Sequence, residues 1–463
     1  MNAHWFNTAF TATAVGQLIS LLATFTLYVM GARLLRPADF ATLALVLSLV
    51  AVCVMVAQVG LHRTIVREAA LLVALGGPTS ARSLLTRALC IVTGSALALA
   101  ILLAIPTTGH IVAAHIGERL MAVLPLASVL VIMRSADLIL GEAHRGMGDV
   151  KRAALHAEAL PRGLGVAVLI AVYAIGWSIS LTTILLVLCA ASGVNATISA
   201  IRLLTTGVRD NGLGVIPLKG KIPTDGVPLK TRGWRDLVSL SVPAWGISIL
   251  IYLVGQFDIW AVAVLASQNN VALYGASSRL AALVVLPLTV ASAVVAPVVA
   301  AAYGRGSLDE LQRLLSGAAA VTSVVAMTMW TVYFLFADQL LLLFFGDPFY
   351  VDAKWLLIIL ATGRVIGVAT GLSGLTLMMA GEQLRYLRLT AVSVAVGIAL
   401  VCGGTSMWGA RGAALGTASG ILVQNIREAS AVRRYFGVFA PVRLRHLRED
   451  IVGFMMELRK RTI

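Results

Sequence analysis

Residues 129–140 read VLVIMRSADLIL, and nine of these twelve residues are apolar or alanine. Such a stretch is typical of a helix that crosses a lipid bilayer, whose core needs about 20 mainly apolar residues. Arg134 and Asp137 nevertheless lie inside it, three residues apart. Because a charged side chain is costly within a span, it is expected to face other protein or a water-filled cavity. The stretch therefore predicts a membrane helix with one polar side.

The composition extends this prediction to the whole chain. Of 463 residues, 59% are hydrophobic and 12% are charged. A soluble domain carries about 25% charged residues. Half of that fraction over this length indicates an all-α integral membrane protein rather than a soluble globule.

Twelve apolar segments are long enough to span a bilayer. They lie at about 8–31, 40–61, 88–106, 120–140, 153–176, 180–201, 238–265, 275–302, 315–337, 355–380, 387–408 and 411–430. The basic segment 202–236 divides them six and six, which predicts an N-terminal lobe at 1–201, a linker loop at 202–236 and a C-terminal lobe at 237–430. Residues 431–463 form a basic tail whose apolar spacing predicts an amphipathic helix on anionic inner-leaflet lipid.

The distribution of cations predicts the orientation. The loops after the even-numbered spans and the tail hold 27 of the 36 Lys and Arg residues, and the opposite loops hold 5. The positive-inside rule then places both termini and the linker in the cytoplasm. The net charge of +15 is explained by topology and lipid contact, with no need for a nucleic-acid partner.

The two lobes resemble copies of each other. LLRPADFATLA (34–44) and VLASQNNVALYG (264–275) both bridge a pair of spans, and GDVKR (148–152) and GEQLR (381–385) both follow the fourth span of a lobe. The offsets are 231–233 residues. Because each copy has an even number of spans, the copies share one orientation, as in transporters with parallel repeats.

Four acidic and basic residues of the fourth and fifth spans are expected at one depth. Arg134 and Arg162 lie at similar distances from the loop between the spans, and so do Asp137 and Glu158. In a regular hairpin the two bases and two acids would meet. The cluster is interpreted either as a neutral structural pin or as a gate at a cavity wall.

The seventh, eighth and tenth spans carry three further charges. Asp258 and Arg279 lie about ten residues on either side of a loop, so they are expected either to form a salt bridge or to act in transport, with Asp258 titrating and Arg279 contacting substrate. Arg364 has no acid within a turn and is the repeat counterpart, within one turn, of Arg134. A lone arginine at mid-membrane is expected to line an aqueous cavity.

Motifs for catalysis and cofactor binding are not found. The segment GVIPLKGKI (214–222) has the wrong spacing for a phosphate-binding loop, and Ile222 replaces the required Ser or Thr. No cluster with the spacing of a metal site occurs. We therefore expect no cofactor, no metal and no catalytic residues, and we favour transport over an enzymatic activity.

LLRPADFATLALVLSLVAVCVMVAQVGLHRTIVRE (34–68) and FDIWAVAVLASQNNVALYGASSRLAALVVLPLTVASAVVAPVVAAAYGRG (257–306) resemble the polysaccharide transport family. These are the Wzx-type flippases of O-antigen and exopolysaccharide repeat units in the MOP superfamily. The resemblance implies two six-helix lobes in a V around a cationic cavity, in the bacterial inner membrane. It also implies that an undecaprenyl-pyrophosphate-linked oligosaccharide is moved to the outer leaflet, coupled to H+ or Na+.

On this resemblance, arginines are expected to bind the anionic cargo, because their planar donors match oxyanions. The substrate-binding candidates are Arg364, Arg279, Arg134 and Arg162, and the coupling or gating candidates are Asp258, Asp137 and Glu158. Two alternatives stay open. A MATE-like antiporter would have the same helices with a more acidic cavity, and a membrane-embedded enzyme of glycan assembly would have larger outer loops.

Overall fold

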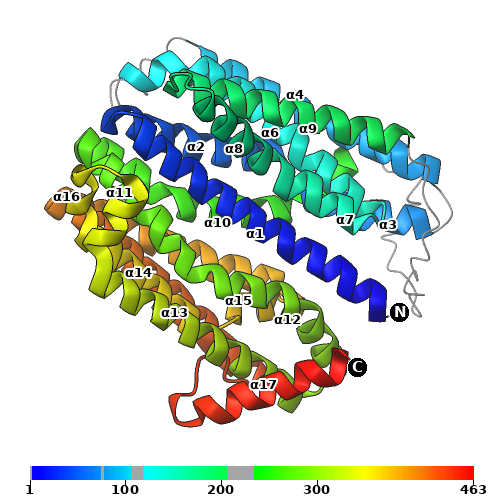
Figure 1. The fold of residues 1–463 in the computed structure, drawn as a ribbon. Coiled ribbons are helices and arrows are strands. Elements are labelled where there is room, and N and C mark those ends of the chain that lie inside the picture. The colour runs from blue at the N-terminus through cyan, green and yellow to red at the C-terminus, as the bar shows by residue number, and fades with distance from the viewer. Residues whose placement is uncertain (1–2, 75–77, 106–117, 206–233, 463) are drawn as a thin grey trace. The chain divides into compact units, whose positions relative to one another are not determined.

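The computed structural model describes residues 3–74, 78–105, 118–205 and 234–462. Within these ranges the chain is helical and contains no strand (Figure 1). Its contacts form two compact units, Met1–Leu27 with Leu45–Tyr252, and Tyr28–Ala44 with Leu253–Ile463. Most of the predicted linker at 202–236 lies outside the described residues.

The helices of the first unit follow the predicted spans and add one that was predicted as loop. They are α1 (Ala3–Leu34), α2 (Pro37–Ala57), α3 (Leu61–Ala74), α4 (Pro78–Ala104), α6 (Glu118–Gly146), α7 (Val150–Ala153), the π-helical segment η1 (Ala154–Ala159), α8 (Leu160–Ala174) and α9 (Leu181–Thr205). The unexpected helix is α3, which packs against α4 and α6. The same unit contains the beginning of α10 (Trp234–Leu265).

The second unit contains the end of α10 and the helices that follow it. They are α11 (Gln268–Ala282), η3 (Leu283–Val285), α12 (Leu286–Gly304), α13 (Leu308–Phe345), η4 (Pro348–Ala353), α14 (Lys354–Ala369), α15 (Ser373–Met379), α16 (Gln383–Phe436), η5 (Leu444–His446) and α17 (Leu447–Thr462). Residues 28–44 join them because their helix ends pack on α11, where a Cβ on Gly275 would lie 3.3 Å from the Cβ of Ala44.

Ten described helices are long and apolar enough to cross a membrane, and the bent pair of α14 and α15 makes an eleventh span. The twelfth comes from α16, whose 54 residues are far longer than one span requires. Its backbone is not helical at Trp408 and Gly409. This break falls between the predicted spans 387–408 and 411–430.

Glycines on the two halves of α16 show that the helix folds back at this break. A Cβ on Gly404 would lie 2.4 Å from the carbonyl oxygen of Gly412, and one on Gly397 would lie 3.8 Å from the Cα of Gly420. Residues equally distant from Trp408 are therefore in contact, so the two halves run antiparallel. With this hairpin, the described helices account for all twelve predicted spans.

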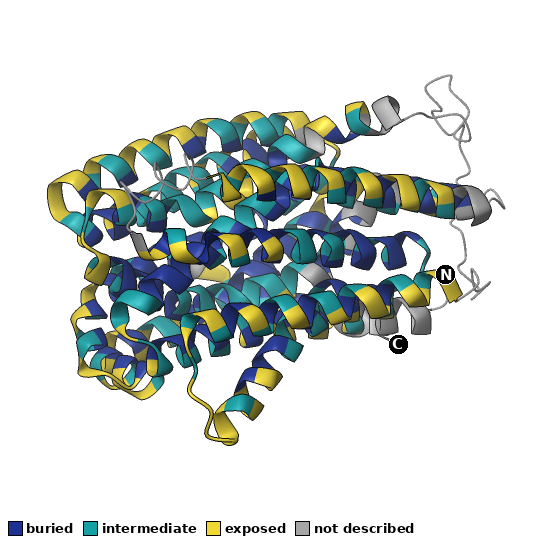
Figure 2. Cartoon of the chain, turned by 90° about the horizontal axis from the view of Figure 1, so that it is seen from above, coloured by how far each residue is buried: buried dark blue, intermediate teal, exposed yellow. Residues whose placement is uncertain are grey.

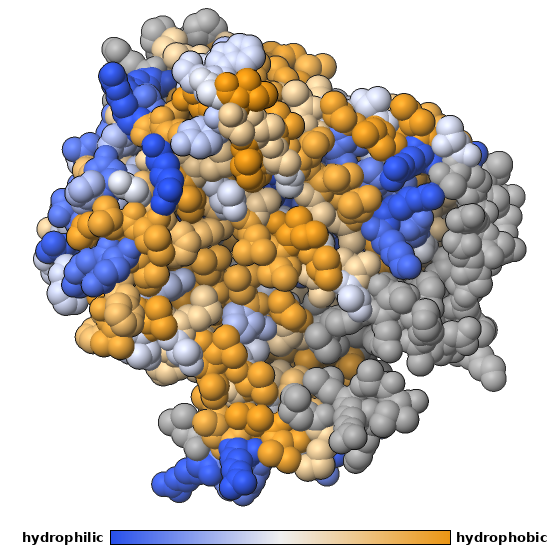
Figure 3. All heavy atoms as spheres, in the orientation of Figure 1, coloured by the Kyte–Doolittle hydropathy of each residue, from blue (hydrophilic) through white to orange (hydrophobic). Residues whose placement is uncertain are grey.

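The surface is consistent with contact to lipid. Buried residues lie on the sides of helices that face other helices (Figure 2), and apolar side chains cover much of the face drawn in Figure 3. In the middle of α13, Phe334, Leu335 and Phe336 are 50%, 61% and 50% exposed. Large apolar side chains exposed in this number indicate a lipid-facing helix rather than one in water.

The C-terminal tail contains the expected helix, α17, and this helix packs beside α13 (Figure 1). Phe454 is 6% exposed, and a Cβ on Gly317 would lie 2.4 Å from its Cβ. Asp450 is held by Arg443, with which it forms an ion pair, so the pKa of the Arg443 guanidinium is raised. Part of the apolar side of the tail is therefore buried on protein.

Candidate functional site

A small cavity in the second unit contains two of the predicted site residues. Its volume is about 110 Å³, and it is bounded by α10, α14 and both halves of α16. Asp258 and Arg364 line it together with Thr417 and Gln424. The cavity thus places an acid and a base from different helices on one wall.

Glycines bring α14 close enough to α16 for Arg364 to reach this cavity. A Cβ on Gly363 would lie 2.7 Å from the Cα of Ala418, and one on Gly367 would lie 3.2 Å from the side chain of Ile421. Small residues of this kind let two membrane helices approach backbone to backbone.

Arg364 has no ion pair or hydrogen-bond partner in the part of the chain that the structure describes, and its Nε is buried. The guanidinium therefore has N–H donors that no described residue uses. A planar fork of this kind matches a phosphate or carboxylate in two-point contact.

Asp258 is 9% exposed, and both of its carboxylate oxygens accept hydrogen bonds. Oδ1 accepts from the backbone N–H of Ile259 at 2.8 Å, and Oδ2 accepts from the Tyr274 hydroxyl at 2.8 Å. The Tyr274 hydroxyl is also 3.0 Å from Oγ1 of Thr417. This chain of hydroxyls joins α10, α11 and α16, and it gives a proton two exchangeable positions beside the carboxylate.

The expected salt bridge between Asp258 and Arg279 is absent from the described ion pairs. Arg279 instead lies over the ring of Tyr28, 4.5 Å from its centroid, with one nitrogen 3.4 Å from Oε1 of Gln256. Tyr274, rather than Arg279, contacts the carboxylate of Asp258. The two residues are five apart on the helix, so their side chains point in directions that differ by about 140°. The prediction counted residues from the loop to Asp258 and to Arg279. Such a count concerns depth in the membrane and does not fix the side of the helix on which Arg279 lies.

Within the predicted four-charge cluster of the first unit, one pair is in ion-pair contact and further partners come from uncharged residues. Nη1 of Arg134 is 3.8 Å from Oδ2 of Asp137, which is 2% exposed. Oδ1 of Asp137 accepts from the amide of Asn195 at 2.8 Å, and Asn195 also contacts His156 at 2.8 Å. The acid therefore has a base on its own helix and an amide from α9.

Glu158 and Arg162 make no ion pair with Arg134 or Asp137 among the described residues, although Arg162 interacts electrostatically with both. Glu158 is 3.5 Å from Nη2 of Arg145, and Arg162 donates to Oγ of Ser20 at 2.5 Å. The prediction assumed a regular hairpin, and the π-helical segment η1 breaks that regularity. A π-bulge inserts an extra residue in a turn, which rotates the residues beyond it by about 100° relative to a continuous α-helix.

The family model described as "Polysaccharide biosynthesis protein" matches residues 29–353. The chain belongs to this polysaccharide biosynthesis protein family. Among curated proteins, none matches the chain.

Solved structures similar to this family member are transporters. A multidrug resistance MATE family transporter of the MOP superfamily, in an inward-facing conformation, gives a TM-score of 0.71 at 17% identity, covering 92% of this chain and 98% of that one. A MOP superfamily transporter from Pyrococcus furiosus, titled for the "reverse polarity" of its binding pocket, gives 0.62 at 17% identity, covering 95% and 96%. At these identities the similarity shows the fold.

The predicted family and the predicted all-α fold of the MOP superfamily are both confirmed. This member of the polysaccharide biosynthesis protein family is a multi-pass membrane protein, and its fold is the one seen in the solved transporter structures. The described residues contain no group of three or more His, Cys, Asp or Glu side chains able to hold a metal ion.

Sequence reasoning missed the neutral partners of the charges in this family member. Tyr274, Asn195 and Ser20 contact Asp258, Asp137 and Arg162 but are uncharged, and only charged residues were singled out within the spans. A usable signal was present, since Asn195 is an amide in an apolar segment, where a polar side chain needs a partner.

Proposed function

We propose that this family member flips a polyprenyl-pyrophosphate-linked oligosaccharide from the inner to the outer leaflet during assembly of surface polysaccharide. The family description supports polysaccharide assembly, and the fold supports transport. The observation that carries the choice of cargo is Arg364, a buried cation with no ion-pair partner in the described chain, on the wall of a cavity.

The chemistry of the cargo complements this site. A pyrophosphate crossing a membrane needs positive charge and hydrogen-bond donors in place of water. Arg364 supplies both, and Arg279 provides a second guanidinium in the same unit. Asp258, with Tyr274 and Thr417 beside it, is the proposed coupling acid, which binds and releases H+ or coordinates Na+ during the cycle.

The first unit has the proposed gate. Arg134 and Arg162 are the proposed contacts for anionic groups of the cargo on that side, and Asp137 and Glu158 neutralise the unit when no cargo is present. The ion pair of Arg134 with Asp137, and that of Arg145 with Glu158, support this assignment.

The proposed location is the bacterial inner membrane, with both termini in the cytoplasm. The cation distribution supports this orientation. Alkaline phosphatase fused after Leu203 or at the C-terminus should be inactive, because the enzyme folds only outside the cytoplasm. High activity of either fusion would reverse the proposed orientation.

The test of the proposed function is Arg364→Ala in a strain that lacks the chromosomal gene. The variant should insert at normal abundance, abolish display of surface polysaccharide and cause lipid-linked repeat units to accumulate on the inner leaflet. Arg364→Lys should restore display in part, because it keeps the charge without the planar fork. Full display by Arg364→Ala at normal abundance would remove Arg364 from the site.

A MATE-like antiporter is the second candidate, and the similarity of fold to MATE transporters supports it. In that case Asp258 would be the exchange site for a cationic substrate. A gene deletion that raises drug sensitivity while leaving surface polysaccharide unchanged would favour this candidate over the flippase.

A further inference from the structure

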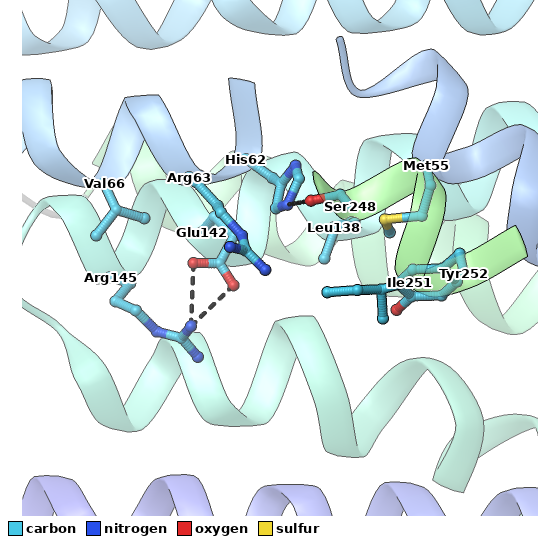
Figure 4. A pocket seen from close by; sticks show the side chains of 10 residues that line it. All are labelled: Met55, His62, Arg63, Val66, Leu138, Glu142, Arg145, Ser248, Ile251 and Tyr252. Atoms are coloured by element: carbon cyan, nitrogen blue, oxygen red, sulfur yellow. Dashed lines mark hydrogen bonds and ion pairs between the residues drawn. The ribbon is translucent and has the colours of Figure 1, made fainter. Parts of the chain in front are cut away.

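A second and larger cavity lies wholly within the first unit, beside the proposed gate, and it is lined by Arg145. Its volume is about 410 Å³, in the range of cavities that hold small ligands. It is an open pocket lined by the end of α2, by α3, by α6 and by the part of α10 that belongs to this unit (Figure 4). Its polar lining comprises His62, Arg63, Glu142, Arg145, Ser248 and Tyr252.

The two arginines of this cavity differ in how they are held. Nη1 of Arg145 donates to both carboxylate oxygens of Glu142, at 2.9 and 3.1 Å, and its Nη2 is 3.5 Å from Glu158. Arg63 is exposed and has no hydrogen bond or ion pair within the described residues, so its interaction with Glu142 is electrostatic only. Figure 4 shows the Glu142 carboxylate between the two arginine side chains. An anionic group can therefore bind Arg63 without displacing an internal ion pair.

The opposite side of the cavity is polar but uncharged at neutral pH. Burial, with a contribution from Arg63, lowers the pKa of His62 to about 4. The Nε2 atom of His62 is 3.4 Å from Oγ of Ser248, and its Nδ1 is buried with no hydrogen-bond partner among the described residues. A neutral imidazole and two hydroxyls, from Ser248 and Tyr252, both donate and accept hydrogen bonds, as sugar hydroxyls require.

The cavity continues toward a residue of the proposed gate. Arg134, Leu138, Glu142 and Arg145 are spaced by four, four and three residues on α6, so they share one face of that helix. Leu138, Glu142 and Arg145 line the cavity, and Arg134 lies further into the span. An anionic group leaving Arg63 would thus meet Arg134 next along the same face.

We propose that this cavity binds a sugar 1-phosphate, the end of the cargo where the first sugar is joined to phosphate. Arg63 binds the phosphate oxygens, while Glu142, His62 and Ser248 bind sugar hydroxyls. The proposal rests on the proposed function for the cargo, and it adds a loading site at the proposed cytoplasmic end of the first unit.

The test is equilibrium binding of α-glucose 1-phosphate to the full chain in phosphatidylcholine nanodiscs, measured by isothermal titration calorimetry. Glucose 1-phosphate should bind more tightly than glucose or inorganic phosphate, because the cavity has contacts for both parts. Arg63→Gln should weaken its binding by roughly tenfold to a hundredfold, the range for hydrogen bonds to a charged group. Arg63→Lys should lose less.

Matched variants separate the contributions of the two halves of the cavity. Arg313→Gln removes an exposed arginine from α13 in the second unit and should leave binding unchanged. Glu142→Gln should weaken binding of glucose 1-phosphate more than that of phosphate. Unchanged binding in Arg63→Gln would overturn the proposal, and so would equal affinities for phosphate and glucose 1-phosphate.

A binding measurement in nanodiscs of a second lipid composition distinguishes a sugar phosphate from the phosphate of a membrane lipid. Replacing half of the phosphatidylcholine with phosphatidylglycerol should leave binding of glucose 1-phosphate unchanged. Loss of binding in these nanodiscs would assign the cavity to a lipid headgroup and overturn the proposal. Because binding requires no transport, failure here leaves the result for Arg364→Ala unaffected, and the converse also holds.

Discussion

Arg134 in the first unit and Arg364 in the second lie within one turn of each other by the predicted repeat offset, and they differ in what surrounds them. Arg134 has Asp137 on its own helix, and Asp137 in turn holds Asn195. Arg364 has no such partner within the described chain, although Asp258 lines the same cavity. Asp258 is instead engaged by Tyr274.

This difference teaches how the same residue type can serve two purposes. An arginine paired within its unit stabilises the helices that it joins, and an anionic ligand must compete with that partner. An arginine whose neighbouring acid is engaged by a hydroxyl keeps its donors for a ligand. The comparison therefore predicts that the first unit loses stability when a charge is removed, whereas the second loses function.

The largest expected effect is that of Asp137→Asn, which leaves Arg134 without its acid. Removing one member of a well-buried pair costs about 3–5 kcal/mol. Thermal unfolding in detergent should show a large decrease in melting temperature, and Arg134→Gln combined with Asp137→Asn should recover part of it. Arg364→Gln should melt as the unmodified protein does. Equal melting temperatures for the single and double variants would contradict pairing.

A smaller effect is expected where glycine positions Arg364. Gly363→Leu puts a side chain into the contact with Ala418, and overpacking of this kind costs about 1–3 kcal/mol. The matched control is Gly403→Ala on α16, because a Cβ there meets no atom within 4 Å. That control should melt at the same temperature or higher, since alanine is the better helix former. Similar melting of the two variants would argue against close packing of α14 on α16.

Tyr274→Phe tests the hydroxyl that holds Asp258. Removing one hydrogen bond of this kind costs about 1 kcal/mol in stability. The more informative result is a changed pH dependence of polysaccharide export, because Asp258 loses the partner that shares its proton. Tyr173→Phe, at an exposed tyrosine of α8, should change neither property. An unaltered pH profile in Tyr274→Phe would separate Asp258 from coupling.

The smallest effect concerns His62 in the first unit. Its pKa is about 4 in the folded protein, below the ordinary value of 6.5. Between pH 6.5 and 4 the unfolded chain binds a proton that the folded chain does not, so stability should fall as the pH decreases through this window. His62→Gln should reduce the dependence of the melting temperature on pH in this window. Identical slopes for the variant and the unmodified protein would contradict the burial of His62.

Apolar length was enough to predict the fold, because the bilayer imposes a minimum length on every span and requires each span to satisfy its own backbone. Even the break in α16 could be placed, since Trp408 falls at the end of one predicted span. The helix α3 was missed because it is short and amphipathic and therefore has no length signal.

The candidate site was predicted less well, because depth in the membrane follows from counting residues whereas direction around a helix does not. The prediction placed Arg364 and Arg279 in one cavity and paired Asp258 with Arg279. In the structure Arg364 lines a cavity with Asp258, and Arg279 lies over Tyr28. In the first unit the π-helical segment η1 contains Glu158, whose ion-pair partner is Arg145, a residue outside the predicted cluster. The sequence of that segment, ALHAEA, contains no residue that would predict an extra residue in the helical turn.

The close contacts between glycines of the two halves of α16 affect how the chain can fold during its synthesis. Residues 397, 404, 412 and 420 bring the last two spans together backbone against backbone, without a side chain from any other helix between them. Association of helices within lipid relies on this kind of close approach. During synthesis the two spans can thus pair with each other as soon as both have entered the bilayer, so that α14 is met by a finished hairpin rather than by two separate helices.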